Sequence, residues 1–147
     1  MKDTFATAPV LFKMLDDFAT PPKRATDGSA GWDLYALDDH DPLMPGEWKM
    51  IGTGASVAIP EGWCGQIWPR SGWALSAGYD TLAGLIDPDY RKELKVLIIN
   101  HGDDALRLRR GYRVGQIVVV PCLTTSYIVD ELPEPASAHD GWGSSGK

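Results

Sequence analysis

“ELKVLIIN” (residues 93–100) alternates with the period of two that a β-strand imposes on its side chains. The even-numbered positions Leu94, Val96 and Ile98 share one face, and Lys95, Leu97 and Ile99 share the other. Because each face carries apolar side chains, both faces of the strand are expected to be buried. The segment is therefore expected to form a strand in a sheet whose two sides are largely covered.

Short β-branched segments of the same kind recur on both sides of this strand. They are “ASVAIP” (55–60), “CGQIW” (64–68) and “GQIVVVP” (115–121), and the 16 glycines and 11 prolines of the chain are spread between such segments. Many short strands with frequent turns are typical of a sandwich or a barrel. The best helical candidate, “SGWALSAG” (71–78), has room for only about two turns. These patterns predict an all-β fold with at most one short helix.

The composition limits the partners of the protein. With 147 residues the chain is long enough for one domain with its own core. Its 20 acidic and 14 basic side chains give a net charge of −6, which argues against binding nucleic acid through the phosphate backbone. No apolar run approaches the length of a membrane span. We expect a cytoplasmic protein, or one of the host cytoplasm for a viral gene, with no nucleic-acid or membrane partner.

The last segment of the chain carries no core pattern. Pro133 and Pro135 stiffen it and small polar residues follow, with Trp142 as its one large anchor. We divide the chain into a β-barrel domain at 1–130 and a C-terminal arm at 131–147. A frayed terminus explains the same residues without a function.

Two segments place charged side chains beside strand-like runs. Asp33 lies between apolar neighbours in “WDLYAL” (32–37), where a carboxylate is usually paired. “WPRSGWA” (68–74) places Arg70 and Ser71 directly after an apolar strand. A guanidinium fork, a hydroxyl and loop N–H groups together suit an oxyanion. An ordinary turn at the end of a strand accounts for the same letters.

A third segment, “LAGLIDPDYRKELKV” (82–96), places Asp87 before a proline and Tyr90 three residues later. A carboxylate fixed by a turn can orient a water while a nearby aromatic ring packs on a sugar or a base. A type I turn with Asp at its first position explains the pattern without chemistry. Gln116 lies near the start of the apolar strand at 115–121. Its side chain either takes part in a functional site or only hydrogen-bonds the end of the strand.

Taken in order along the chain, these segments resemble the five motifs of the trimeric dUTP pyrophosphatase (dUTPase) family. The five are “SAGWDLYA” (29–36), “PRSGWA” (69–74), “GLIDPDYRKELKV” (84–96), “RGYRVGQIVVVP” (110–121) and “GWGSSG” (141–146). The resemblance implies a distorted, jelly-roll-like β-barrel and a homotrimer with its active sites at the subunit interfaces. It implies Mg²⁺-assisted hydrolysis of dUTP to dUMP and pyrophosphate, which keeps uracil out of DNA and supplies dUMP for dTMP synthesis. The glycine-rich tail would be a mobile arm that closes over a neighbouring site.

The resemblance also implies roles for individual residues. Asp87 would orient the attacking water with help from Gln116, and Tyr90 would pack against the deoxyribose. Three residues, Arg70, Ser71 and Gly72, would bind the phosphates. Asp33 would lie near the water shell of the Mg²⁺ ion.

Uracil would be read by backbone groups of a hairpin at 79–86, and its ring would be covered by the arm. The hairpin residues implied are Thr81, Ala83, Gly84, Leu85 and Ile86, with Lys95 contributing backbone beside them. In the arm, Trp142 would stack on the base, and Gly143 and Ser144 would also contact the nucleotide.

The chain departs from the family pattern at a few positions. Ser137 stands where the family carries an arm arginine for the γ-phosphate, Trp73 stands where Leu is common, and Thr81 stands where some relatives have Asn. Two alternatives therefore stay open beside a dUTPase. One is an enzyme of the same fold that acts on dCTP, as a deaminase or a pyrophosphatase. The other is a trimer with an added role in binding a regulatory protein partner.

Overall fold

The computed structural model describes residues 8–136 of the chain, and within them one short helix accompanies many short strands. The strands are β1 (Leu11–Met14), β2 (Gly31–Tyr35), β3 (His40–Leu43), β4 (Trp48–Gly52), β5 (Ala55–Ala58), β6 (Trp63–Trp68), β7 (Tyr79–Leu82), β8 (Leu85–Ile86), β9 (Lys95–Asn100), β10 (Leu106–Leu108) and β11 (Arg113–Pro121). The helix α1 covers Ser71–Ala77. The predicted all-β fold with at most one short helix is confirmed.

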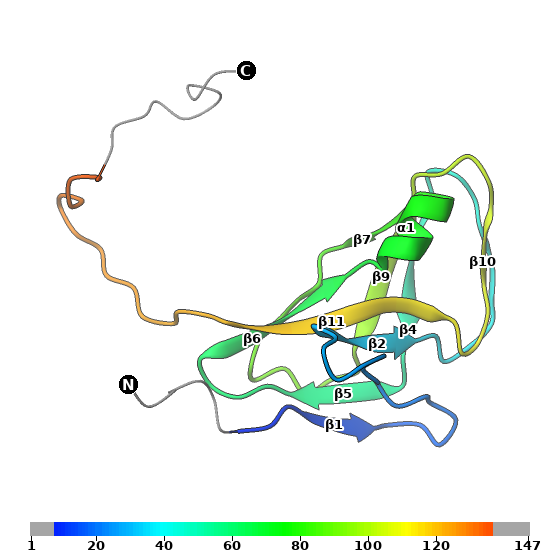
Figure 1. The fold of residues 1–147 in the computed structure, drawn as a ribbon, viewed down its shortest axis with the longest axis horizontal. Coiled ribbons are helices and arrows are strands. Elements are labelled where there is room, and N and C mark those ends of the chain that lie inside the picture. The colour runs from blue at the N-terminus through cyan, green and yellow to red at the C-terminus, as the bar shows by residue number, and fades with distance from the viewer. Residues whose placement is uncertain (1–7, 137–147) are drawn as a thin grey trace.

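The strands form antiparallel sheets that close around one core (Figure 1). One sheet has the order β2-β11-β6-β8 and another has the order β4-β9-β7, while β1 pairs with β5 and β10 with β3. The segment that opened the sequence analysis becomes β9, the middle strand of its sheet. Val96 and Ile98 on that strand are fully buried, because β9 has a neighbour on each side and the core beneath it.

The segment 79–86 differs from the paired hairpin that the family resemblance implies. Strand β7 pairs with β9, whereas β8 pairs with β6, so the two strands belong to different sheets. Ala83 and Gly84 between them have φ values of 57° and 103°, both in the left-handed region. The Ile67 N–H donates to the Gly84 carbonyl at 2.8 Å and holds this turn against β6. Two consecutive left-handed residues redirect the chain from one sheet to the next.

The long strand β11 ends at Pro121, and the chain then leaves the barrel (Figure 1). Residues 122–136 contain neither helix nor strand, and Leu123, Tyr127 and Ile128 in this part are exposed. The predicted boundary at residue 130 stays a prediction, and the arm residues from 137 onward lie outside the described part. Among residues 8–136, no helix combines the length and the apolar character that crossing a membrane requires.

Candidate active site

Two of the predicted site residues, Asp33 and Gln116, share the outer face of the β2-β11-β6-β8 sheet with Trp68. Asp33 on β2 pairs in register with Gln116 on β11, and Gln116 pairs with Trp68 on β6. Leu34, Ile67 and Ile117 alternate with these residues and point into the core. Because strand side chains alternate between faces, Asp33, Gln116 and Trp68 lie on the side away from the core.

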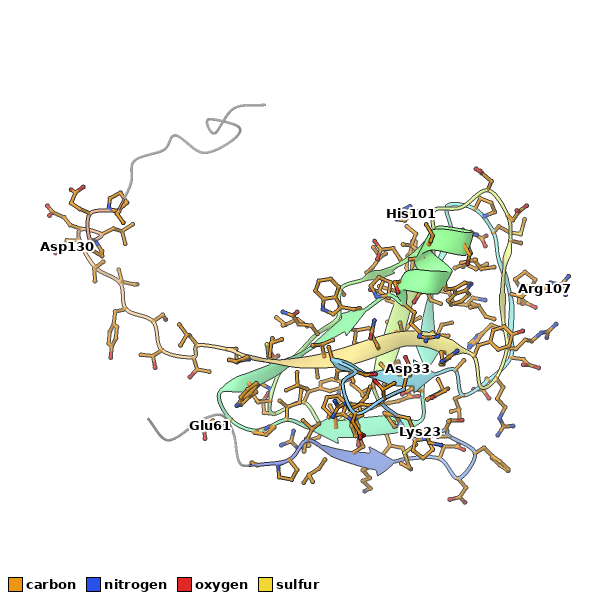
Figure 2. The ribbon with its side chains drawn as sticks, in the orientation of Figure 1. Lys23, Asp33, Glu61, His101, Arg107 and Asp130 are labelled. Carbon is orange, nitrogen blue, oxygen red and sulfur yellow. The ribbon has the colours of Figure 1, made fainter. Side chains whose placement is uncertain are left out.

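Asp33 is held by two arginines on this face. Its Oδ1 lies 3.0 Å from Nε of Arg70, and its Oδ2 lies 3.6 Å from a terminal nitrogen of Arg113. The residue is only 7% exposed, so the carboxylate depends on these cations for compensation. The pairing expected for a charged residue in an apolar run is confirmed. Figure 2 labels Asp33, which lies beside β11 in the body of the barrel.

Sequence reasoning did not single out Arg113. Residues 113 and 116 are an odd number apart, so a regular strand would place them on opposite faces. The register of β11 against β2 shifts between Arg113 and Gly115, where a bulge inserts one extra residue. The bulge brings Arg113 opposite Tyr35, on the same face as Asp33. The periodicity of the sequence gives no signal for this insertion.

The predicted phosphate-binding residues lie at the start of α1 and border a cavity of about 210 Å³. Arg70 is the N-cap in an extended conformation, and Ser71 and Gly72 form the first turn. The same cavity is lined by Asp33 and Gln116. Gln116 Nε2 donates to the Pro69 carbonyl at 3.0 Å, which fixes its amide beside the strand end. The structure thus brings all five of these predicted residues together.

Tyr79, the first residue of β7, was predicted only as the start of the hairpin at 79–86, and sequence reasoning missed its contact with Arg70. Its hydroxyl accepts a hydrogen bond from the backbone N–H of Arg70, and the residue is 2% exposed. Burial raises the pKa of Tyr79 above its ordinary value, although the hydrogen bond from Arg70 and the Arg70 charge act in the opposite direction. The phenol therefore stays neutral at physiological pH.

A second pocket, of about 410 Å³, lies between the end of β6 and the turn that joins β7 to β8. It is lined by four of the predicted base-reading residues, Thr81, Ala83, Gly84 and Leu85. Its other walls are the strand end at 66–69 and Asp80. Ile86, also predicted, points into the core, and the Lys95 side chain pairs with Glu93 at 3.6 Å. Neither Ile86 nor Lys95 lines this pocket.

Asp87 and Tyr90 lie apart from both cavities. The Tyr90 N–H donates to the Asp87 carbonyl at 3.1 Å, which confirms the predicted turn, and the Tyr90 hydroxyl donates to the Glu93 carbonyl at 2.7 Å. Asp87 follows Ile86, whose partner Gly65 precedes Trp68 on β6 by three residues. Asp87 therefore falls opposite residue 64, four residues from Trp68, which places it about 13 Å along the sheet and about two strand spacings across it from Gln116. One chain does not bring these two predicted catalytic residues together.

The remaining predicted residues concern the arm and the metal. Trp142, Gly143 and Ser144 lie outside the described residues. Within residues 8–136, no group of three or more His, Cys, Asp or Glu side chains could hold a metal ion. Asp33 is the carboxylate in the 210 Å³ cavity, and both of its oxygens already face arginines. These residues would suit a Mg²⁺ ion held mainly by substrate phosphates and water, and Asp33 could then contact only its water shell.

Comparison with known proteins identifies the family. Residues 17–146 match the dUTPase family, a span that includes all five of the sequence motifs. This chain belongs to the dUTPase family. A deoxyuridine 5'-triphosphate nucleotidohydrolase from Hydrogenobaculum sp. is 39% identical over 140 residues, covering 93% of this chain and 97% of the relative. One from Paramecium bursaria Chlorella virus 1 is 37% identical over 139 residues, with the same coverage of 93% and 97%.

Solved dUTPases share the fold. A variant of the Staphylococcus bacteriophage 80alpha dUTPase, solved with dUpNHpp, has a TM-score of 0.81 at 26% identity and covers 96% of this chain and 100% of its own. A mutant of the dUTPase from phage phi11 of S. aureus, whose structure reveals how a structural Mg(II) ion is coordinated, has a TM-score of 0.74 at 24% identity, and the match covers 84% of this chain and 98% of the phage protein. The predicted dUTPase-like barrel is confirmed.

Proposed function

We propose that this protein hydrolyses dUTP to dUMP and pyrophosphate. The observation that carries the proposal is the cavity in which Asp33, Arg70, Ser71, Gly72 and Gln116 meet, in a chain of the dUTPase family. A guanidinium, a hydroxyl and a strand-end amide converge there on a space of about 210 Å³. Such a set binds and orients an anionic phosphate chain.

Each group of the cavity has a part in the reaction. Arg70 pairs with Asp33 through Nε, so its two terminal nitrogens stay available for a bidentate contact with phosphate oxygens. Ser71 donates its hydroxyl to the same chain of phosphates. Negative charge grows on the leaving pyrophosphate, and fixed cations stabilise it there without reorganisation.

Water attack on the α-phosphorus needs a group that removes a proton from the water. Asp87 is the proposed base: its carboxylate takes the proton while Gln116 helps to hold the water in line with the leaving group. Since one chain separates these two residues, we propose that Asp87 of a second copy completes each site of a homotrimer. Tyr90 from the same turn would then contact the deoxyribose.

The charge of the substrate implies a divalent cation. Mg²⁺ would neutralise part of the triphosphate charge, and Asp33 is the residue that would face its bound water. The second pocket, lined by Thr81, Ala83, Gly84 and Leu85, would receive the uracil. Backbone groups there reject cytosine, because its amine would place a donor where an acceptor is required.

The decisive experiment measures pyrophosphate release from dUTP, dCTP, dTTP and UTP, with Mg²⁺ and with EDTA. We expect Mg²⁺-dependent turnover of dUTP and at least about 100-fold less of the other three nucleotides. Turnover of dCTP in place of dUTP would contradict the proposed base, and dUTP as the product from dCTP would indicate a deaminase. Equal turnover of UTP would contradict the role of Tyr90.

A further inference from the structure

The helix α1, which carries phosphate-binding residues, is short and has no side-chain cap, and Trp73, Ala74 and Ala77 pack it against the core while staying partly exposed. Within the described chain it has seven residues, none of them buried, and its N-cap Arg70 makes no side-chain capping hydrogen bond. Its first turn holds no acidic residue and its last turn no basic one. A helix of two turns is marginal by itself, so tertiary contacts must hold Arg70, Ser71 and Gly72 in place.

Tyr79 supplies two of these contacts from the other end of the helix. Gly78 ends α1 in the left-handed conformation, with φ of 67°, and turns the chain back so that Tyr79 begins β7. The Tyr79 ring then lies against Trp73, with centroids 4.2 Å apart and the planes inclined at 37°. Its hydroxyl reaches the Arg70 N–H, one of the helix-start donors that no turn of the helix can satisfy.

We propose that Tyr79 is a positioning residue for phosphate binding: it holds the Arg70 backbone and, through Trp73, the first turn of α1 against the cavity. Trp73 itself lines that cavity with Arg70. The guanidinium of Arg70 is then fixed from two directions, by Asp33 at Nε and by Tyr79 at the backbone. This inference rests on the proposed function and assigns a residue that the motifs of the family resemblance do not include.

The test is Tyr79→Phe, which keeps the ring against Trp73 and removes only the hydroxyl. Two ligands separate phosphate binding from nucleoside binding. The analogue dUpNHpp contacts the phosphate-binding residues, whereas deoxyuridine has no phosphates. We expect the affinity for dUpNHpp to fall about tenfold, because Arg70 loses one hydrogen bond that orders it, while the affinity for deoxyuridine stays unchanged. Isothermal titration calorimetry well below the unfolding temperature measures both.

Each outcome bears on the inference. Unchanged affinity for dUpNHpp would overturn it, since a purely structural hydroxyl changes stability and not phosphate binding. Equal losses for both ligands would also overturn it, because the disturbance would not be confined to the phosphates. A wild-type protein that neither binds dUpNHpp nor cleaves dUTP would overturn the proposed function, and this inference with it.

Two further variants make the test specific. Tyr112→Phe removes the same hydroxyl from a half-exposed residue in the turn before β11 and should leave both affinities unchanged. Trp73→Phe keeps the Tyr79 hydroxyl but places a smaller ring against the Tyr79 ring. It should lower the affinity for dUpNHpp by about threefold and leave the affinity for deoxyuridine unchanged. If Tyr79→Phe fails to fold, Trp73→Phe decides: an unchanged affinity for dUpNHpp would overturn the inference.

Discussion

Asp33 shows how one buried carboxylate can organise a site. It pairs with Arg70 and Arg113 at once and is nearly buried, so neutralising it leaves two neighbouring guanidinium groups without their shared carboxylate. Asp33→Asn keeps the shape and removes the charge. We expect a loss of about 1–2 kcal/mol in the free energy of unfolding, measured by urea denaturation, since both arginines are partly exposed to water. Turnover of dUTP should fall by at least about tenfold because Arg70 loses its anchor.

Asp39→Asn is the matched control for this substitution. Asp39 also pairs with an arginine, Arg109, at 3.7 Å, but both side chains are more than half exposed. Exposed pairs contribute little, so stability and turnover should stay within experimental error of the wild type. Equal effects of the two substitutions would contradict the special role of the buried carboxylate.

The sequence predicts a site residue where that residue belongs to a short local pattern. Asp33 stands inside an apolar run, Arg70 and Gln116 stand at the ends of such runs, and the structure brings the three together. Arg113 and Tyr79 were not predictable. Arg113 reaches Asp33 only because of the bulge in β11, and Tyr79 reaches Arg70 only because the chain reverses after α1. Local periodicity carries neither piece of information.

The C-terminal end of α1 is as constrained as its start. Gly102 lies beside the last turn, where a Cβ would collide with the carbonyl oxygen of Ala77. The His101 N–H also donates to the Gly78 carbonyl at 2.9 Å. Gly102→Ala should push the helix end away and lower the free energy of unfolding by about 1–3 kcal/mol, measured by urea denaturation.

The control for this glycine is Gly28→Ala. A Cβ at position 28 would have Thr26 Oγ1 at 4.0 Å as its nearest neighbour, and the backbone there is not left-handed. Its effect should stay within about 0.5 kcal/mol of zero. A Gly102→Ala protein as stable as the wild type would show that α1 can shift without cost.

The elements themselves were more predictable than their partners. The segment 115–121 becomes the C-terminal part of β11, 64–68 falls within β6, and 71–78 contains α1, because alternation and turn residues are local signals. The separation of β7 and β8 into different sheets was not predictable, since strand pairing depends on contacts between residues distant in sequence. That separation is what gives the second pocket its two walls.

In the whole molecule, the residues proposed for the two halves of the reaction lie at opposite sides of one sheet. The cavity with Arg70 and Gln116 lies at the β2-β11 side, and Asp87 follows the edge strand β8. A proton acceptor must come within about 3 Å of its donor, so the separation of more than about 10 Å within one chain rules out a joint action there. In the proposed homotrimer, closed rotational symmetry would bring Asp87 of each copy to the cavity of one neighbour.

Mixing two inactive variants tests this arrangement. Asp87→Asn and Arg70→Ala should each reduce dUTP turnover by orders of magnitude when they are alone. In trimers refolded from an equal mixture, a site works when its cavity comes from an Asp87→Asn chain and its carboxylate from an Arg70→Ala chain. Random assembly gives that combination at about a quarter of the sites, so about a quarter of wild-type turnover should return. A site built within one chain would recover no turnover, since every chain would carry one defect.

Mixing the folded variants without exchange of subunits is the control. It should also recover no turnover, because intact trimers of either variant contain no complete site.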